Sequence, residues 1–579
     1  MIKQLLKQVK EFKRDSILTP VFIIFEVFME VLIPLLMSKI IDNGVSKGDL
    51  GYVYKLGAIM FGISLLSLFF GTIAGKTGAT ASAGFARNLR KAMFYNIQNF
   101  SFSNIDKYST AGLITRLTTD VTNVQNAYHM IIRMFVRSPI MLISAMVMCF
   151  TINARLSLVF LGAVLFLGFS LYFIITHALP YFKMMFRKYD DVNSSLQENL
   201  TGIRVVKAYV KEEYETDKFH KASGQVYDYS VKAERLIILN APIMQLTVYS
   251  CILLLSWLGA KMVVGSSMTT GELMSLFTYT SNILISLMLI SMVFVMIIMA
   301  KSSAERIVEI IDEESDLINK ELAITEVKDG AIDFDHVSFS YVKDKDNYAL
   351  SDVNIQIKSG ETIGIIGGTG SSKSSFVQLI PRLYDVTEGA VRVGGVDVRD
   401  YDLNTLRNQV AMVLQKNVLF SGTIKENLKW GNPEATDEEI IRVCKLAQAH
   451  DFIQTFEQGY DTHIEQGGTN VSGGQKQRLC IARALLKRPR VLILDDSTSA
   501  VDTRTDALIR KAFKEEIPEV TKLIIAQRIS SIQDADRIIV LNDGMVDGFG
   551  THDELLQNNT IYQEVYHSQM KGADFDDGK

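Results

Sequence analysis

The sequence predicts two parts of different fold class: a helical membrane-spanning domain and, after it, a soluble α/β domain. Six apolar runs occupy the first half of the 579-residue chain, and most of them approach or exceed the ~20 residues that cross a bilayer core. The second half interleaves short, turn-bounded apolar runs with helical segments, which is typical of a mostly parallel sheet covered by helices. A mean hydropathy of +0.17 beside 21% charged residues agrees with a membrane part joined to a soluble part.

The overall charge and the cysteines narrow the classes of function. A formal net charge of -4 gives no reason to suspect a nucleic-acid partner, so we expect none. The cysteines are far apart and lack the spacing of a metal site, which favours reduced thiols over a disulfide framework. They are Cys149, Cys251, Cys444 and Cys480.

The spacing of the apolar runs predicts the topology of the first half. Runs one and two, three and four, and five and six are joined by short loops, whereas the two remaining links are long, polar and rich in lysine and arginine. The positive-inside tendency assigns these long links to the cytoplasm, and an even number of spans then leaves both termini there. The runs cover roughly 17–41, 56–75, 138–152, 156–179, 236–264 and 273–300.

Two glutamates, Glu26 and Glu30, lie one helical turn apart inside the first predicted span. An ionisable group at membrane depth is costly, so it faces a cavity or a partner. Either the two carboxylates line a substrate cavity that favours cationic or zwitterionic cargo, or they form a structural hydrogen-bonding pair near one membrane face. The sequence leaves both interpretations open.

The chain changes character after the sixth run. A charged stretch extends the last helix and leads into a linker, and from there strand-like runs such as ETIGIIG, VLILDD and KLIIAQR alternate with helical segments. We therefore predict a membrane domain over 1–311, a linker over 312–329 and an α/β domain over 330–579.

A glycine-rich loop, GIIGGTGSSKSS at 364–375, follows a predicted strand and precedes a helix. It resembles the phosphate-binding loop G-x-x-x-x-G-K-[ST], in which backbone N–H groups and a helix N-terminus hold phosphates. Lys373 would reach the β- and γ-phosphates and the Ser374 hydroxyl would ligate Mg²⁺, but Ser372 stands where the motif has its last glycine. The predicted nucleotide-binding residues here are Gly367, Gly368, Thr369, Gly370, Ser371, Ser372, Lys373, Ser374 and Ser375.

The stretch 471–502 resembles the signature and Walker B region of ATP-binding cassette (ABC) proteins, a family of P-loop ATPases. The resemblance implies that Asp495, at the end of a buried strand, holds Mg²⁺, and that Asp502 belongs to the D-loop. It also implies that Tyr341 stacks on adenine and that Gln415 contacts Mg²⁺ or the attacking water. The signature is intact at Ser472, Gly473, Gly474 and Gln475.

The membrane half resembles the exporter type of ABC membrane domain. The long links contain AGLITRLTTDV at 111–121 and ENLTGIRVVKAYVKEE at 198–213, which are similar to the intracellular loops of ABC exporters. In those proteins long helices leave the membrane and end in short coupling helices on the ATPase domains. The resemblance thus covers nearly the whole chain.

The ATP site departs from the family pattern at three positions. Asp496 replaces a glutamate that polarises the attacking water, and its carboxylate is drawn back by about 1 Å, a displacement that can cost roughly a hundredfold in rate. Gln527 replaces a histidine that contacts the γ-phosphate; glutamine can donate a hydrogen bond but cannot carry the charge. With Ser372, all three departures fall on one site, so we expect it to bind ATP and hydrolyse it slowly.

ABC domains pair head to tail, so each signature completes the partner's site. An altered Walker side beside an intact signature predicts one subunit of a heterodimeric ATP-driven exporter of drugs, lipids or peptides. Its cofactors would be ATP and Mg²⁺, its partner a second half-transporter with the consensus glutamate and histidine, and its location a bacterial plasma (inner) membrane. Two alternatives stay open: a homodimeric flippase or drug exporter with reduced ATPase activity, and a non-transporting ABC regulator.

Overall fold

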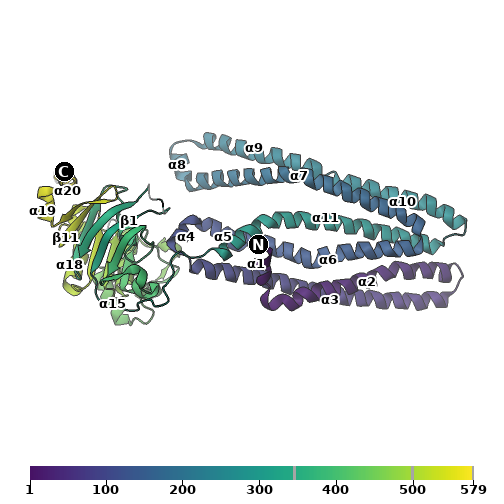
Figure 1. Cartoon of the computed structure of the whole chain (residues 1–579), viewed down its shortest axis with the longest axis horizontal. Helices are drawn as coiled ribbons and strands as arrows, with labels where there is room; N and C mark the ends of the chain where they lie inside the picture. The colour runs from purple at the N-terminus through teal and green to yellow at the C-terminus, as the bar shows by residue number, and fades with distance from the viewer. Residues whose placement is uncertain (343, 345–346, 497–500, 577–579) are drawn as a thin grey trace. The chain divides into compact units, whose positions relative to one another are not determined.

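The structure is a computed structural model that describes residues 1–342, 344, 347–496 and 501–576, with the backbone alone at 570–576 (Figure 1). Internal contacts divide the chain into two units. The first contains Met1–Asn99 and Ser109–Glu313, and the second contains Phe100–Tyr108 and Glu314–Lys579. The short segment Phe100–Tyr108, which the predicted boundaries assigned to 1–311, thus counts with the second unit.

Six helical stretches in the described chain are long and apolar enough to cross a membrane, in the predicted order. Each is longer than the apolar run that predicted it, because polar helical extensions continue beyond the apolar part. They appear in Figure 1 as long rods joined by short loops and by the two long links. Their bounds are Lys10–Val45, Leu50–Gln98, Thr110–Ile152, Ala154–Thr201, Glu212–Val264 and Thr270–Asp312.

Side-chain caps begin these helices just after the short loops. Asn153 accepts hydrogen bonds from the backbone N–H groups of Arg155 and Leu156, and Thr269 forms a capping box with Glu272. Such caps satisfy N–H groups that have no partner within the helix. The elements are α1 (Ile2–Lys7), η1 (Lys10–Phe12), α2 (Lys13–Lys39), η2 (Ile40–Val45), α3 (Leu50–Gln98), α5 (Thr110–Thr115), η3 (Arg116–Asp120), α6 (Val121–Ile152), α7 (Ala154–Thr201), α8 (Ile203–Ala208), α9 (Glu212–Ile237), α10 (Asn240–Val264) and α11 (Thr270–Asp312).

The first unit is held by helix packing and by a few buried polar contacts. Helix α2 packs on α3 and α6, α6 packs along α11, and α7 packs along α9 and α10. Just before α6, buried Asp120 accepts hydrogen bonds from Arg306 Nε at 2.7 Å and from Ser303 Oγ at 2.8 Å. Because Asp120 is in the π-helix η3 and both donors are on α11, the contact ties these two elements together.

In its described residues the second unit contains two larger sheets and a small one. The six-stranded sheet has the order β12-β11-β3-β10-β9-β6, all neighbours being parallel except β11 and β12. The four-stranded sheet β2-β1-β4-β5 is antiparallel. The strands are β1 (Ile332–Phe339), β2 (Leu350–Ile357), β3 (Thr362–Gly367), β4 (Glu388–Val393), β5 (Val396–Asp397), β6 (Val410–Val413), β7 (Gly422–Thr423), β8 (His463–Ile464), β9 (Val491–Asp495), β10 (Thr521–Ile525), β11 (Arg537–Asn542) and β12 (Met545–Gly550).

Two apolar cores lie on the two faces of the six-stranded sheet. One joins it to the four-stranded sheet, where the rings of Phe334 and Phe376 stack with centroids 4.2 Å apart. The other lies under the helices that follow β6. The helices of this unit are α4 (Phe102–Lys107), α12 (Lys373–Gln378), η4 (Val398–Asp400), α13 (Leu403–Gln409), α14 (Ile424–Lys429), α15 (Asp437–Leu446), α16 (His450–Gln454), η5 (Gly459–Asp461), η6 (Gln466–Gly468), α17 (Gly473–Leu485), α18 (Thr503–Glu516), η7 (Ile529–Ser531), α19 (His552–Asn558) and α20 (Thr560–Asp576).

The helix α4 explains why Phe100–Tyr108 belongs to the second unit. The ring of Phe102 meets the edge of Tyr384 with centroids 6.0 Å apart, and the Tyr384 hydroxyl donates to Asp106 Oδ2 at 2.5 Å. Burial and the nearby carboxylate raise the pKa of Tyr384, so its hydroxyl stays a donor at neutral pH. The helix that docks on the α/β fold therefore precedes the 111–121 stretch from which the intracellular loop was inferred.

Candidate functional site

Adjacent parallel strands deliver the glycine-rich loop, Gln527 and the Asp495–Asp496 pair to one edge of the six-stranded sheet. In the ladder, Ile365 of β3 pairs with Ile525 of β10, and Ile525 pairs with Asp495 of β9. The glycine-rich loop, the Gln527 loop and the Asp495–Asp496 pair therefore leave the sheet side by side. The carboxyl edge of a parallel sheet is where such folds bind their ligands.

Lys373 is held inside the glycine-rich loop. Its ammonium donates to the carbonyl oxygens of Gly367 at 2.9 Å and Gly368 at 2.7 Å, and to Ser371 Oγ at 3.2 Å. Burial lowers the pKa of Lys373, while Asp496 and Asp495 oppose that shift. The loop thus keeps a cation at the position from which the predicted phosphate contacts would be made.

Ser372 adopts a left-handed backbone conformation, with φ 66° and ψ 25°. Only glycine visits this region without cost, and an L-residue there is destabilised by roughly 1–2 kcal/mol. The replacement of the motif's last glycine therefore leaves the loop conformation possible but strained.

The Ser374 hydroxyl donates to Asp495 Oδ1 at 3.1 Å, which joins the glycine-rich loop to the end of β9. Asp495 is 3% exposed, and burial raises its pKa, with Asp496 adding to the shift and Ser374 and Lys373 opposing it. Hard oxygen ligands with a buried negative charge fit Mg²⁺. Ser374 and Asp495 would hold that ion, which when bound would neutralise charge on the phosphates.

Gln415 does not hydrogen-bond Ser374 or Asp495 in the described residues. It lies exposed in a bend two residues after β6. The structure thus places Gln415 at the same sheet edge, since Val413 pairs with Leu494 of β9, but without a hydrogen bond to either predicted metal ligand in the described residues.

The two substituted positions Asp496 and Gln527 contact each other. Gln527 Nε2 donates to Asp496 Oδ2 at 2.7 Å. Asp496 is 9% exposed and its φ is 48°, a second non-glycine residue in the left-handed region at this site. One carboxylate oxygen is therefore engaged by a neutral amide that cannot accept a proton in exchange.

Tyr341 lies beside the glycine-rich loop. Its hydroxyl shares a hydrogen bond of 2.8 Å with Ser375 Oγ, and its ring meets Phe339 and Tyr384 edge-on at 4.8 and 5.2 Å. The side chain is half exposed, which leaves part of it accessible for the predicted stacking on adenine.

The signature residues begin helix α17. Ser472 caps the helix, since its Oγ accepts from the Gln475 backbone N–H at 3.2 Å while Gln475 Oε1 accepts from the Ser472 N–H at 2.9 Å. Ser472 and Gly473 are exposed. In the part of the chain that the structure describes, no hydrogen bond or ion pair joins the signature to the glycine-rich loop.

Glu26 and Glu30 of α2 both pair with Arg137 of α6, a residue that sequence reasoning missed. Arg137 Nη1 contacts Glu26 Oε1, and Arg137 Nη2 contacts Glu30 Oε2 at 2.7 Å. The side chains are 16%, 38% and 26% exposed for Glu26, Glu30 and Arg137. The third apolar run begins at Ser138, and Arg137 stands one residue before it in the same helix. Its charge next to an apolar run was the signal that could have identified it.

Family comparisons cover both units of the chain. Residues 16–302 match the ABC transporter transmembrane region, and residues 350–499 match the ABC transporter family itself. A relative from Bacillus subtilis (strain 168), an uncharacterized ABC transporter ATP-binding protein called YfiB, is 38% identical over 550 residues, with 95% of each chain covered.

Two further comparisons concern proteins with a more specific description. The ATP-dependent lipid A-core flippase of Desulfotalea psychrophila (strain LSv54 / DSM 12343) is 32% identical over 566 residues, which is 96% of this chain and 92% of that protein. A solved structure of a bacterial Atm1-family ABC exporter with ATP bound superposes with a TM-score of 0.83 at 25% identity, over 96% of this chain and 99% of the other. The likeness extends through the membrane unit and the α/β unit alike.

Proposed function

Because the chain belongs to the ABC transporter family and has an ABC exporter fold with one membrane unit and one ATPase unit, we propose that it is one subunit of an ATP-driven exporter. Its own site binds ATP with Mg²⁺ and turns it over slowly. Its signature completes the hydrolytic site of a second half-transporter that carries the consensus glutamate and histidine.

The hydrogen bond between Gln527 and Asp496 is the observation that carries this proposal. A residue that polarises water needs a carboxylate oxygen directed at the water, and here Oδ2 accepts an amide N–H instead. The shorter side chain of Asp496 already draws the group back by about 1 Å, which can cost roughly a hundredfold in rate. Both changes act on the chemical step and leave the phosphate-binding loop in place.

The remaining residues divide the work of binding. Lys373 would exchange its carbonyl partners for phosphate oxygens, Tyr341 would stack on the adenine, and Ser374 with Asp495 would hold Mg²⁺. Ser472 and Gly473, exposed at the start of α17, would face a phosphate bound by the partner. The chain would lie in a bacterial plasma membrane with both termini in the cytoplasm, in agreement with its lysine- and arginine-rich long links.

The cargo class follows from the charge of the α2–α6 cluster. One arginine faces two carboxylates, and Glu30 is the more exposed of the two at 38% of its side chain. The surplus negative charge of this three-residue cluster supports a cationic or zwitterionic drug, lipid or peptide as cargo. The relative named as a lipid A-core flippase supports a lipid-like substrate.

The subunit role is tested by expressing the tagged chain in its native cells and identifying what co-purifies. We expect a second half-transporter, and we expect ATP turnover and efflux from vesicles only when both chains are present. A chain that purifies with itself alone and turns over ATP briskly supports the homodimeric alternative. A pair that hydrolyses ATP but moves no substrate supports the regulator.

The cargo class is tested in the same vesicles with a permanently cationic dye and a neutral dye. We expect Glu30→Gln to reduce efflux of the cationic dye severalfold while efflux of the neutral dye is kept. Glu26→Gln, which removes the more buried partner of Arg137, is the matched comparison. Equal losses for both dyes in Glu30→Gln contradict a role of this carboxylate in cargo selection.

A further inference from the structure

We propose that Gln569, on the C-terminal helix α20, is a positioning residue for the ATP site, because it holds the backbone of the loop that carries Gln527. The inference goes beyond the proposed subunit role. It assigns to the C-terminal helix a part in setting the geometry at the γ-phosphate end of the site.

The contact uses both ends of one carboxamide. Gln569 Nε2 donates to the Gln527 carbonyl oxygen at 2.8 Å, and Gln569 Oε1 accepts from the Ile529 N–H at 2.9 Å. The two backbone groups are two residues apart, so one side chain fixes both the spacing and the orientation of the loop. An adjacent β-strand satisfies a backbone N–H and C=O in a comparable way, with its own peptide groups.

Helix α20 is itself anchored, which gives Gln569 a defined position. Tyr562 is fully buried and its hydroxyl hydrogen-bonds His552 Nδ1 at 2.7 Å. Val565 and Tyr566 pack against the same core as Tyr562. With Gln569 these residues follow the i, i+3, i+4, i+7 pattern of one helix face. The docked face of α20 therefore carries the carboxamide to the loop.

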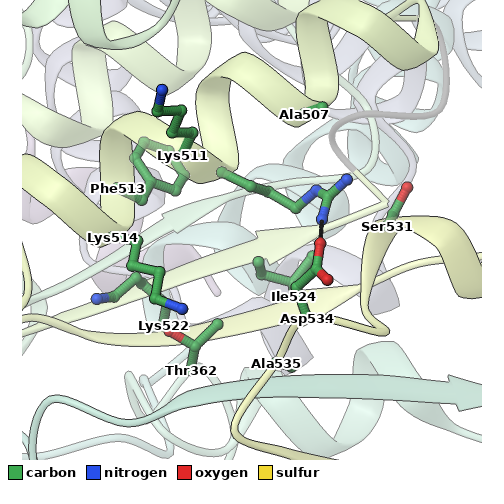
Figure 2. A pocket seen from close by; sticks show the side chains of 11 residues that line it. Thr362, Ala507, Lys511, Phe513, Lys514, Lys522, Ile524, Ser531, Asp534 and Ala535 are labelled. Atoms are coloured by element: carbon green, nitrogen blue, oxygen red, sulfur yellow. Dashed lines mark hydrogen bonds and ion pairs between the residues drawn. The ribbon is translucent and has the colours of Figure 1, made fainter. Parts of the chain in front are cut away.

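Apolar side chains also hold this loop, since Ile529 and Ile532 are buried in the same core as Tyr562. A cavity of about 270 Å³ lies between α18 and this part of the chain, where Ser531, Asp534 and Ala535 line it. Figure 2 shows these side chains. Next to the cavity, Ser531 Oγ donates to Asp506 Oδ2 at 2.9 Å and Arg510 Nη1 donates to Asp534 Oδ2 at 2.8 Å.

The effect of Gln569 reaches the site through Gln527. The backbone carbonyl of Gln527 accepts from Gln569, while the side chain of Gln527 donates to Asp496. Both Nε2 and Oε1 of Gln569 bond backbone atoms. Gln569 therefore acts on the nucleotide only by placing Gln527. Loss of this bridge should let the loop move and misplace the Gln527 amide.

The test compares two near-isosteric substitutions on the same helix in the full chain in detergent. Gln569→Met removes the bridge. Gln563→Met is the matched control, because Gln563 Nε2 also donates to backbone carbonyls, at 2.7 Å to Leu556 and 3.2 Å to Gln557 in α19, and not to the loop. Amide hydrogen exchange of the peptide 526–531 and the ATP concentration that half-saturates binding are measured in both.

We expect Gln569→Met to speed exchange of the Ile529 amide by about fivefold and to raise the half-saturating ATP concentration about threefold, as the loss of one ordinary hydrogen bond implies. Gln563→Met should leave both unchanged. In a Gln527→Ala background, Gln569→Met should still speed exchange but should no longer alter ATP binding.

Two results overturn the proposal: equal effects of Gln563→Met and Gln569→Met on the loop, or an undiminished effect of Gln569→Met on ATP binding when Gln527 is alanine. Neither measurement needs turnover. A chain that proves to be a brisk ATPase would refute slow hydrolysis at its own site and leave this test of Gln569 fully informative.

Discussion

At the carboxyl edge of the six-stranded sheet, Ser372 and Asp496 are non-glycine residues with φ of 66° and 48°. At the start of α17, by contrast, Ser472 has φ -68° and makes both hydrogen bonds of a capping box. The first region carries three departures from the family pattern and the second carries none. Ser372 and Asp496 thus combine a substitution with a left-handed backbone at the half-site that this chain would use itself, whereas Ser472, at the half-site that it would offer to a partner, keeps an ordinary helix cap.

The largest effect should come from a substitution in the signature, the part that follows the family pattern. Gly473→Asp places a carboxylate at the first turn of α17, where it favours the helix but repels a phosphate bound by the partner. We expect turnover of the two-chain complex to fall by about a hundredfold, the scale of losing one well-placed electrostatic contact. Gly473→Asn is the neutral control. A complex that keeps its rate with Gly473→Asp would show that this signature serves no hydrolytic site.

Restoring the family's residues at Asp496 and Gln527 should have the next largest effect. In a complex whose partner has lost its own catalytic carboxylate, Asp496→Glu with Gln527→His should restore turnover by up to about a hundredfold over the unrepaired pair. Steady-state phosphate release measures it, with each single substitution as the comparison. If the double substitution restores nothing, the slow step lies elsewhere than in these two side chains.

Substitution of a predicted Mg²⁺ ligand should have a smaller effect. It tests ATP binding at this chain's own substituted site, separately from the rate of hydrolysis. Ser374→Ala removes one predicted Mg²⁺ ligand, and we expect ATP affinity in Mg²⁺ to fall by roughly tenfold or more, with no change in excess EDTA. Ser375→Ala, which loses only the contact with Tyr341, should keep the full response to Mg²⁺. An equal response in both variants would remove Ser374 from the metal site.

The smallest expected effect concerns strain. Ser372→Gly relieves a left-handed residue, a gain of roughly 1–2 kcal/mol, partly offset by about 0.4–1 kcal/mol of added freedom in the unfolded chain. The ATPase unit should therefore unfold a few degrees higher in a thermal scan. Thr369→Gly, at a position outside the left-handed set, should lower the transition. A lower transition in Ser372→Gly would place the strain elsewhere.

Features that lie within one continuous stretch of sequence could be predicted, and features that join distant residues could not. The loop around Lys373, the buried strand end at Asp495 and the signature at Ser472 are contiguous patterns, so their residues could be named from the order of amino acids alone. The six-span order could be predicted for the same reason, because apolar length is a local property. Ser372, Asp496 and Gln527 were each recognisable as substitutions by comparison with the family pattern.

The features that escaped prediction join residues far apart in the chain. The Gln527–Asp496 bond depends on the pairing of β9 with β10, which brings two separately noted positions into contact. Arg137 reaches Glu26 and Glu30 across two helices, and the bond between Tyr384 and Asp106 spans 278 positions. Spacing within one segment carries no information about such pairs.

The most direct test of the asymmetry is the steady-state ATPase rate of the purified chain alone, measured beside Asp496→Asn, with ATP binding followed separately. The account predicts that both proteins bind nucleotide in Mg²⁺ and that both show negligible turnover, because the intact signature has no competent site to complete. Brisk turnover by the unmodified chain that collapses in Asp496→Asn would contradict it and identify a working homodimer.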